Sequence, residues 1–231
     1  EGDLENLLKG LMRDAPPDSV GLVDTMGCAL PQTIAYMVGW MKELTGGLPI
    51  EVHTHNDFGM AVACELAGIA AGAEVVHSCV CGLGERTGNA ALEELVLGMN
   101  ILLGMETPYR LEKLGELCAV VEELSGIQAA PNKPFVGRRN YTRESGIGVN
   151  LVVEKPLAMF ATDPRLFGRQ ADIALGKKSG KASVQYYLDL LGRTASEEQT
   201  AEILQRVKEL GAGKKALVTL EEFCGILDSC C

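Results

Sequence analysis

Residues 50–59, Ile-Glu-Val-His-Thr-His-Asn-Asp-Phe-Gly, constrain the fold more than any other stretch of the chain. Ile50 and Val52 are β-formers on one face of a predicted strand, and His53 and His55 share the opposite face because strand side chains alternate. The polar residues that follow end the strand, and a helix is predicted directly after them. Two imidazoles at a strand's C-terminal end can bind a divalent metal. The alternative is an ordinary hydrogen-bonded pair, but two of the chain's 3 histidines lie here, which favours the metal site.

Short apolar strands alternate with helices through the first 104 residues. Each predicted strand ends in polar residues, and the strands begin roughly 25–30 residues apart, as in a (β/α) barrel or a doubly wound sheet. The pattern predicts helices over 3–12, 31–44, 60–71 and 90–103, and strands over 19–23, 50–55 and 74–80. Three strand–helix units cannot close a barrel of eight strands.

The pattern changes after residue 107, where helices follow one another without strands. Helices are predicted over 111–124, 182–191, 196–210 and 219–227, with a loop-rich stretch over 126–155. Two of these helices begin with the spacing of a capping box, at Ser196 with Gln199 and at Thr219 with Glu222. We therefore expect two domains, a partial α/β barrel over 1–106 and a mainly helical accessory region over 107–231.

Composition restricts the partners and the compartment. The 231 residues carry a formal net charge of −10, which argues against nucleic acid or an anionic membrane as a partner. No apolar run approaches the length of a membrane span, and no signal peptide is visible. Eight cysteines are too few for a disulfide scaffold of this length, and buried thiols are expected at Cys28, Cys64, Cys79 and Cys118. These features favour a reducing cytoplasm.

Three polar segments follow the predicted strands and would meet at the mouth of a barrel. They are Asp24 with Thr25, the histidine pair, and the glycine-rich loop 82–89 that ends in Asn89. Asn89 can supply an oxygen beside the two imidazoles, and a dication also needs a carboxylate. Asp24, Asp57 or chain outside this sequence could provide it. The donor set suits zinc, manganese or magnesium to different degrees.

Other residues near the mouth have two interpretations each. Thr25 offers a hydroxyl beside the metal or caps a helix. His77, on the third strand, is an acid–base candidate or packs inside the barrel. Glu85 and Arg86 support the ligand or form an ion pair that braces the mouth. The basic loop 176–181 lacks the full spacing of a phosphate loop, so a solvated turn is expected there.

These motifs resemble the isopropylmalate, homocitrate, citramalate and Re-citrate synthase family of the DRE-TIM metallolyase superfamily. The resemblance covers residues 1–104 strongly and continues through 144–147 and 175–180. It implies the C-terminal part of a TIM (β/α)8 barrel, followed by a mainly helical accessory subdomain. It also implies a cytoplasmic, metal-dependent acyltransferase of amino-acid or carboxylic-acid biosynthesis. Such an enzyme condenses acetyl-CoA with a 2-oxo acid by a Claisen reaction followed by thioester hydrolysis.

Four residues match positions with known roles in that family. The resemblance implies that His53 and His55 are metal ligands, that Asn89 lies at or near the metal, and that Thr25 holds the carboxylate of the 2-oxo acid. The metal would polarise the 2-oxo carbonyl towards attack by the acetyl enolate. The sequence as given ends without the long regulatory domain of leucine-regulated isopropylmalate synthases, so we expect the homocitrate or Re-citrate type.

Three departures from the family pattern qualify this reading. The Arg-Asp motif that ends the first barrel strand is absent, and Gly148 and Lys178 stand where the family often has histidines. His77 is then the remaining histidine that could carry a proton. We expect these residues to be a partial enzyme that is inactive alone, completed by an N-terminal half or by a homodimer. The alternatives are a related acyl-CoA lyase of the hydroxymethylglutaryl-CoA type and a non-catalytic subunit that completes a barrel.

Overall fold

The computed structural model describes residues 2–230, which form two compact units divided between Ala129 and Ala130. Helix α5 (Leu114–Ser125) belongs to the first unit because it packs against the turn η1 (Val80–Gly82). From the sequence we predicted a domain boundary after residue 106. That boundary remains a prediction. Each unit has its own buried core.

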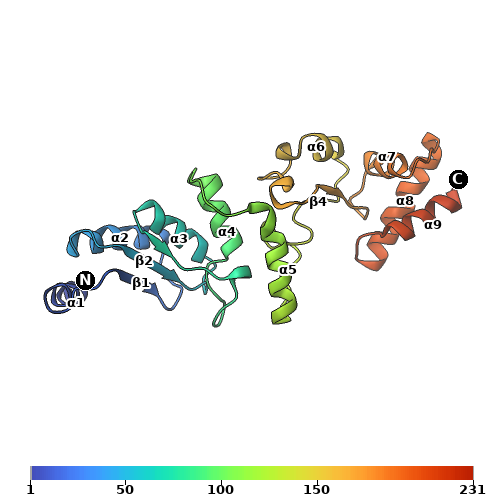
Figure 1. The fold of residues 1–231 in the computed structure, drawn as a ribbon. Coiled ribbons are helices and arrows are strands. Elements are labelled where there is room, and N and C mark those ends of the chain that lie inside the picture. Colours follow the sequence, from blue (N-terminus) through green and yellow to red (C-terminus); the bar gives the residue numbers. More distant parts are fainter. Residues whose placement is uncertain (1, 231) are drawn as a thin grey trace. The chain divides into compact units, whose positions relative to one another are not determined.

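The first unit is built on three parallel strands, β1 (Val20–Asp24), β2 (Ile50–Thr54) and β3 (Val75–Val76), in that order (Figure 1). The register pairs Val23 with His53 and Asp24 with Thr54, so the first two strands end together. The unit's helices and turns are α1 (Gly2–Asp14), α2 (Pro31–Leu44), α3 (Ala61–Ala70), η1, α4 (Leu92–Leu97), the π-turn η2 (Gly98–Leu102), η3 (Leu111–Lys113) and α5. The predicted parallel α/β arrangement is confirmed.

One face of the sheet is buried and the other is not. Ile50 and Val52 are fully buried against α2 and α3, and an added Cβ at Gly68 would lie 3.0 Å from Val52 Cγ2. The next side chains along β2 point to the opposite face, where they are only half-buried. In a (β/α) barrel the helices cover the outside, so this half-buried face is the one that faces the barrel interior.

The third strand and the helix after it are shorter than predicted. Pairing of β3 with β2 stops at Val76, and the chain then turns through η1, where Cys81 has a φ of 59°. The backbone of Cys79 pairs with Ala90 and Leu92, so α4 begins only at Leu92. The expected strand over 74–80 and helix over 90–103 were therefore wrong at their ends, because a left-handed turn and backbone pairing replace regular structure there.

The second unit is mainly helical. Its elements are β4 (Thr142–Arg143), α6 (Val149–Glu154), η4 (Pro156–Ala158), η5 (Pro164–Phe167), β5 (Asp172–Ile173), α7 (Lys181–Leu190), α8 (Glu197–Lys214) and α9 (Leu220–Cys230). The core of its last three helices includes Val207 and Phe223, both fully buried. Both capping boxes are confirmed: Ser196 pairs with Gln199, and residues 219 and 222 exchange hydrogen bonds in the same way. The short α6 and β4 lie within the stretch 126–155 that we expected to be loop-rich.

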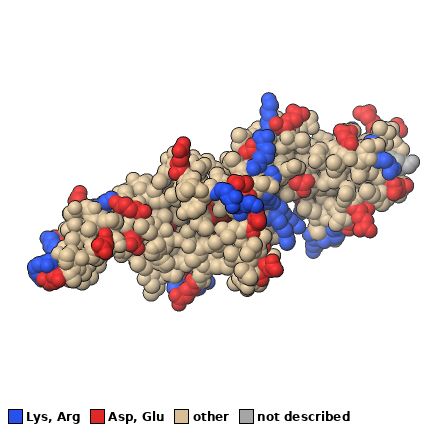
Figure 2. All heavy atoms as spheres, in the orientation of Figure 1, with Lys and Arg blue, Asp and Glu red and all other residues tan. Residues whose placement is uncertain are grey.

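Two of the four cysteines that we expected to be buried are buried in the structure. On the face drawn in Figure 2 the acidic side chains are spread widely, whereas many of the basic side chains gather in one region. None of the described cysteines forms a disulfide, and Cys64 and Cys118 are buried as expected. Cys28 is exposed, so the prediction of a buried thiol there was wrong, and Cys79 is half-buried. Among the described residues no helix has the length and apolarity needed to span a bilayer.

Candidate metal and substrate site

The site lies at the C-terminal end of β2, where the strand's alternation presents three polar side chains on the half-buried face. Glu51, His53 and His55 point to that face, while Val52 and Thr54 are buried on the other. The rings of His53 and His55 are 5.1 Å apart between centroids. The structure therefore brings the two predicted metal ligands together, as the sequence spacing indicates.

Asn89 lies against both histidines. Its Nδ2 atom is 3.2 Å from His53 Nε2 and 3.4 Å from His55 Nδ1. The side chain is buried, and the backbone of Asn89 forms an isolated antiparallel bridge with His55. Rotating the amide by 180° would place its oxygen beside the imidazoles, at the cost of the Nδ2 hydrogen bond to the Thr54 carbonyl oxygen. Three ligand-type side chains thus converge from β2 and from the loop before α4.

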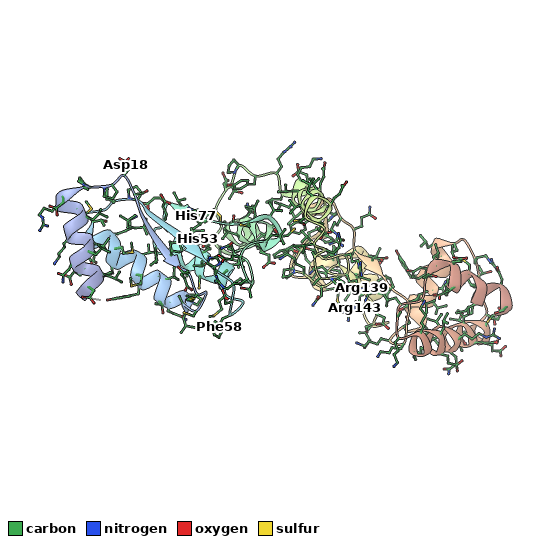
Figure 3. The ribbon with its side chains drawn as sticks, turned by 90° about the horizontal axis from the view of Figure 1, so that it is seen from below. Asp18, His53, Phe58, His77, Arg139 and Arg143 are labelled. Carbon is green, nitrogen blue, oxygen red and sulfur yellow. The ribbon has the colours of Figure 1, made fainter. Side chains whose placement is uncertain are left out.

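His77 also joins the cluster, from the end of β3. Its Nδ1 is 3.3 Å from His53 Nδ1, and its Nε2 is 3.4 Å from Glu51 Oε2. Figure 3 shows His53 and His77 next to each other on the sheet. If Glu51 accepts the Nε2 proton of His77, then His77 Nδ1 can accept the Nδ1 proton of His53. That chain leaves His53 Nε2 unprotonated on the side of Asn89.

The electrostatics favour neutral imidazole at His53. Partial burial lowers the pKa of His53, and the neighbouring His55 and His77 lower it further. A neutral imidazole has the lone pair that a metal ligand needs. The donor set of two imidazoles and an amide oxygen therefore fits a divalent metal such as zinc or manganese.

Arg86, Asp57 and the backbone of Thr25 are joined by hydrogen bonds, which we call the brace; the sequence indicated it only in part. Arg86 donates to both carboxylate oxygens of Asp57, at 3.0 and 2.9 Å, and to the carbonyl oxygen of Thr25 at 2.6 Å. The bracing ion pair expected between Glu85 and Arg86 is thus formed by Arg86 with Asp57. Thr25 itself is exposed beside this brace.

Both nearby aspartates already have hydrogen-bond partners in this arrangement. Asp57 is held by Arg86, and this hydrogen bond lowers the pKa of the Asp57 carboxyl. Asp24 accepts a hydrogen bond from the Ala29 amide at 2.8 Å, at the turn before α2.

Glycines let the loop 82–89 approach the site closely. A Cβ at Gly84 would lie 2.2 Å from Asn89 Oδ1, and one at Gly88 would overlap the carbonyl oxygen of Gly82. Gly88 has a φ of 84°, and its carbonyl accepts a hydrogen bond from the Asn56 amide at 2.9 Å. The loop is therefore fixed by backbone contacts that side chains would block.

The positions that depart from the family pattern lie in the second unit. Gly148 has a φ of 78°, and an added Cβ would lie 3.2 Å from Met159 Cε, so a side chain would be strained there. The backbone amide of Lys178 donates to Glu144 Oε1 at 3.0 Å. The side chain of Ser179 is buried, so the loop 176–181 is anchored instead of fully solvated.

Glu51 and Glu65 were not singled out from the sequence. Glu51 could have been found, because it lies two residues before His53 on the same strand face. Glu65, on α3, is fully buried and accepts two hydrogen bonds from Thr54, from its amide and its hydroxyl, both at 2.9 Å. Burial raises the pKa of Glu65 to about 8. No sequence pattern distinguishes this glutamate from those on the helix surfaces.

Comparison with known protein families shows which family the chain belongs to. The HMGL-like family model matches residues 3–121, which include the histidine pair and Asn89. The chain belongs to the HMGL-like family. A second model, described as the homocitrate synthase post-HMGL domain-like region, matches residues 135–215. The resemblance stated from the motifs and the predicted fold class, part of a TIM barrel followed by a helical region, are confirmed.

Curated relatives extend this similarity over most of the chain. Homocitrate synthase of Methanocaldococcus jannaschii is 41% identical over 227 residues, 97% of this chain and 56% of the relative. A probable 2-isopropylmalate synthase of Ignicoccus hospitalis is 40% identical over 198 residues, 86% of this chain and 50% of the relative. The chain thus spans about half the length of these relatives.

A solved structure is also similar. An HMG-CoA lyase from Acinetobacter baumannii is 25% identical and covers 56% of this chain and 44% of its own, with a TM-score of 0.49. That likeness is too weak to distinguish a lyase from a synthase.

Proposed function

We propose that this chain is part of a metal-dependent acyltransferase that condenses acetyl-CoA with a 2-oxo acid. The proposal rests on one observation above all: His53, His55 and Asn89 converge at the strand ends of a chain about 40% identical to homocitrate and 2-isopropylmalate synthases. The relatives are named for different products, homocitrate and 2-isopropylmalate, so the proposal stops at the class of 2-oxo acids.

His53, His55 and Asn89 would hold the metal. When bound there, a divalent metal supplies Lewis acidity that polarises the carbonyl of a 2-oxo acid. The chain's own residues prepare the site: Glu51 and His77 select the tautomer of His53, and the bridge between His55 and Asn89 fixes the two ligands relative to each other. The remaining carboxylate ligand belongs, in this proposal, to residues outside this sequence.

Thr25 and His77 have proposed roles towards the substrate. The hydroxyl of Thr25 is exposed, and its backbone is held by Arg86, so it can donate a hydrogen bond to a substrate carboxylate from a fixed position. His77 is half-exposed, with its Nδ1 atom 3.3 Å from His53 Nδ1 and its Nε2 atom 3.4 Å from a Glu51 carboxylate oxygen. It is our candidate to carry a proton during enolate formation.

The complete enzyme contains partners that these residues do not provide. Side chains on the half-buried face of the sheet, including Val23, are exposed in this unit. An N-terminal barrel half, in the same protein or in a partner chain, would cover them, and a homodimer is the expected assembly. A non-catalytic subunit that completes a barrel would use the same surface without turnover.

The test measures thioester release by the complete protein with acetyl-CoA and a panel of 2-oxo acids. The proposal is supported if CoA release depends on one 2-oxo acid, and if the His53→Ala/His55→Ala variant loses both this activity and its bound metal. The exposed variant Lys9→Ala serves as the control. Cleavage of 3-hydroxy-3-methylglutaryl-CoA without condensation would establish the lyase alternative instead, and no turnover with either substrate class would favour the non-catalytic subunit.

A further inference from the structure

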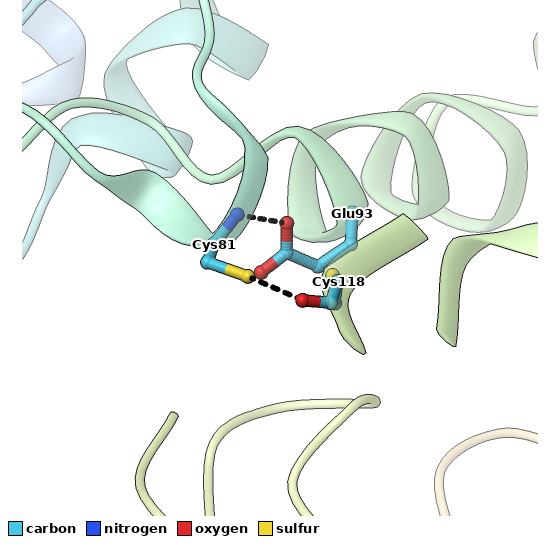
Figure 4. A group of neighbouring side chains, drawn as sticks. All are labelled: Cys81, Glu93 and Cys118. Atoms are coloured by element: carbon cyan, nitrogen blue, oxygen red, sulfur yellow. Dashed lines mark hydrogen bonds between the residues drawn. The ribbon is translucent and has the colours of Figure 1, made fainter. Parts of the chain in front are cut away.

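A second cluster of ligand-type side chains lies in the first unit and shares no residue with the histidine site. Cys81, Glu93 and Cys118 come from η1, α4 and α5, and their sulfur and carboxylate oxygen atoms all lie within 4.8 Å of one another (Figure 4). Glu93 and Cys118 are buried, and Cys81 is half-buried. The three residues are separated by 12 and 25 positions, so the fold and not local sequence brings them together.

The backbone holds this cluster in place. Glu93 Oε2 accepts a hydrogen bond from the Cys81 amide at 2.9 Å, and the Cys81 thiol lies 3.9 Å from the carbonyl oxygen of Cys118. Cys81 has a φ of 59°, in the left-handed region that a residue with a Cβ seldom adopts. The turn therefore keeps a strained conformation at the residue whose side chain enters the cluster.

We propose that Cys81, Cys118 and Glu93 bind a thiophilic divalent cation, with zinc as the type case. Two thiolates and one carboxylate are a donor set that selects zinc-like ions over magnesium or calcium, which prefer oxygen ligands. The half-buried side chain of Cys81 gives an ion access from solvent and leaves room for a water as the fourth ligand.

The spacing of the ligand atoms is close to what such an ion needs. A tetrahedral zinc with Zn–S bonds of about 2.3 Å holds two sulfurs roughly 3.8 Å apart. Since the atoms already lie within 4.8 Å, shifts of about 1 Å in side chains complete the geometry.

Binding must displace protons. Burial and the neighbouring Glu93 raise the pKa of the Cys118 thiol, so this group is protonated when no ion is bound. On binding, two S–H bonds break and two metal–sulfur bonds form, and two protons pass to solvent. The dication offsets two of the three negative charges that the thiolates and the carboxylate then carry.

The consequence is a cross-link among three elements. Both α4 and α5 contact η1, and the ion would join the three elements directly. An ion that binds only the folded state stabilises it in proportion to ion concentration. The site is therefore assigned a structural role, separate from the proposed catalytic metal.

The experiment uses the complete protein with His53→Ala/His55→Ala, which removes the other proposed metal site, and Cd²⁺ as a spectroscopic probe under a non-thiol reductant. We expect one equivalent of Cd²⁺ by equilibrium dialysis, thiolate-to-metal charge-transfer absorption, and a melting temperature that rises with added Zn²⁺. Adding Cys81→Gly should abolish all three signals. Glycine suits the positive φ, so this variant is expected to fold, and circular dichroism checks that it does.

Two further variants make the assignment specific. Glu93→Gln should weaken Cd²⁺ binding by roughly tenfold or more, because the charged oxygen ligand becomes a neutral amide. Cys28→Ser, which removes an exposed thiol of the same unit, should change nothing. Absence of tight Cd²⁺ binding, binding without charge-transfer absorption, or binding that survives Cys81→Gly would each overturn the proposal. So would a Cys81–Cys118 disulfide in the freshly purified protein.

Discussion

Arg86 donates two hydrogen bonds to the Asp57 carboxylate, at 3.0 and 2.9 Å, and its guanidinium also donates to the carbonyl oxygen of Thr25. One side chain therefore connects the loop 82–89 to the ends of β1 and β2. A bidentate guanidinium fixes direction as well as distance, which a lysine ammonium cannot do. We expect this contact to fix the position of Thr25 relative to His53 and His55.

Arg86→Lys should therefore lower catalysis more than stability. We expect kcat/KM of the complete enzyme to fall by roughly 10- to 100-fold, because small misplacements of binding groups have effects of that size. Unfolding by urea should change little, because the pair is partly exposed. Arg13→Lys, at an exposed pair with the adjacent Asp14, is the matched control. Unchanged kcat/KM in Arg86→Lys would show that the brace is dispensable.

Gly27 allows β1 and β2 to end close together. It is buried with a φ of 58°, and an added Cβ would lie 2.7 Å from both the Asp57 amide nitrogen and the His55 carbonyl oxygen. Gly27→Ala should lower the free energy of unfolding by at least about 1–2 kcal/mol, the cost of left-handed backbone in a residue with a Cβ. The backbone clash adds to this cost and displaces His55.

Gly39→Ala is the control for that variant. Gly39 lies inside α2, and no atom stands within 4 Å of an added Cβ. Alanine should be favourable there by roughly 0.5–1 kcal/mol, because glycine is a poor helix former. Urea denaturation of both variants measures the contrast, and equal stability of the two would contradict the packing argument.

The sequence predicted those parts of the molecule that depend on local pattern. The alternation along residues 50–55 placed His53 and His55 on one face correctly, and Pro31 marks the first turn of α2 as the structure has it. Helix caps such as Ser196 with Gln199 were also predictable, because the partners are three residues apart.

Contacts between distant side chains could not be predicted in the same way. An ion pair of Arg86 with its neighbour Glu85 was one of two interpretations of the sequence, but the fold places Asp57 within reach of Arg86. Cys81 has no partner at metal-site spacing in the sequence, and its neighbours Glu93 and Cys118 are set by packing of α4 and α5. The end of the third strand was missed because the left-handed turn at Cys81 is unusual for that residue type.

Glu65 should make stability fall as pH rises. The pKa of its carboxyl is near the ordinary value of 4.5 in the unfolded chain, but burial raises the pKa to about 8 in the folded one. Between these values the folded state binds more protons, so the free energy of unfolding decreases with pH by at most about 1.4 kcal/mol per unit. The stability that the protonated carboxyl contributes is fully present below its pKa in the unfolded chain. It is lost as the pH rises through its pKa in the folded protein.

Glu65→Gln removes this slope. The amide oxygen can still accept the two hydrogen bonds from Thr54, and no charge forms in the core. Urea unfolding of Glu65→Gln and of the unchanged protein from pH 5 to pH 8 gives the comparison, with the exposed Glu43→Gln as control. Parallel stability curves for Glu65→Gln and the unchanged protein would mean that Glu65 is already ionised in the fold.

His77 can act on the substrate or only orient His53, and two variants separate these roles. As a proton carrier, His77→Gln should reduce kcat roughly 100-fold while metal content and KM for the 2-oxo acid are retained, since general acid–base catalysis contributes about 10²–10⁴. The pH–rate profile should lose one limb.

As an orienting residue, His77 acts through its contacts with His53 and Glu51, so His77→Gln and Glu51→Gln should both weaken metal binding. A His77→Gln enzyme with full kcat, the same pH profile and full metal content would leave His77 with neither role and would move the proton carrier to another part of the complete enzyme.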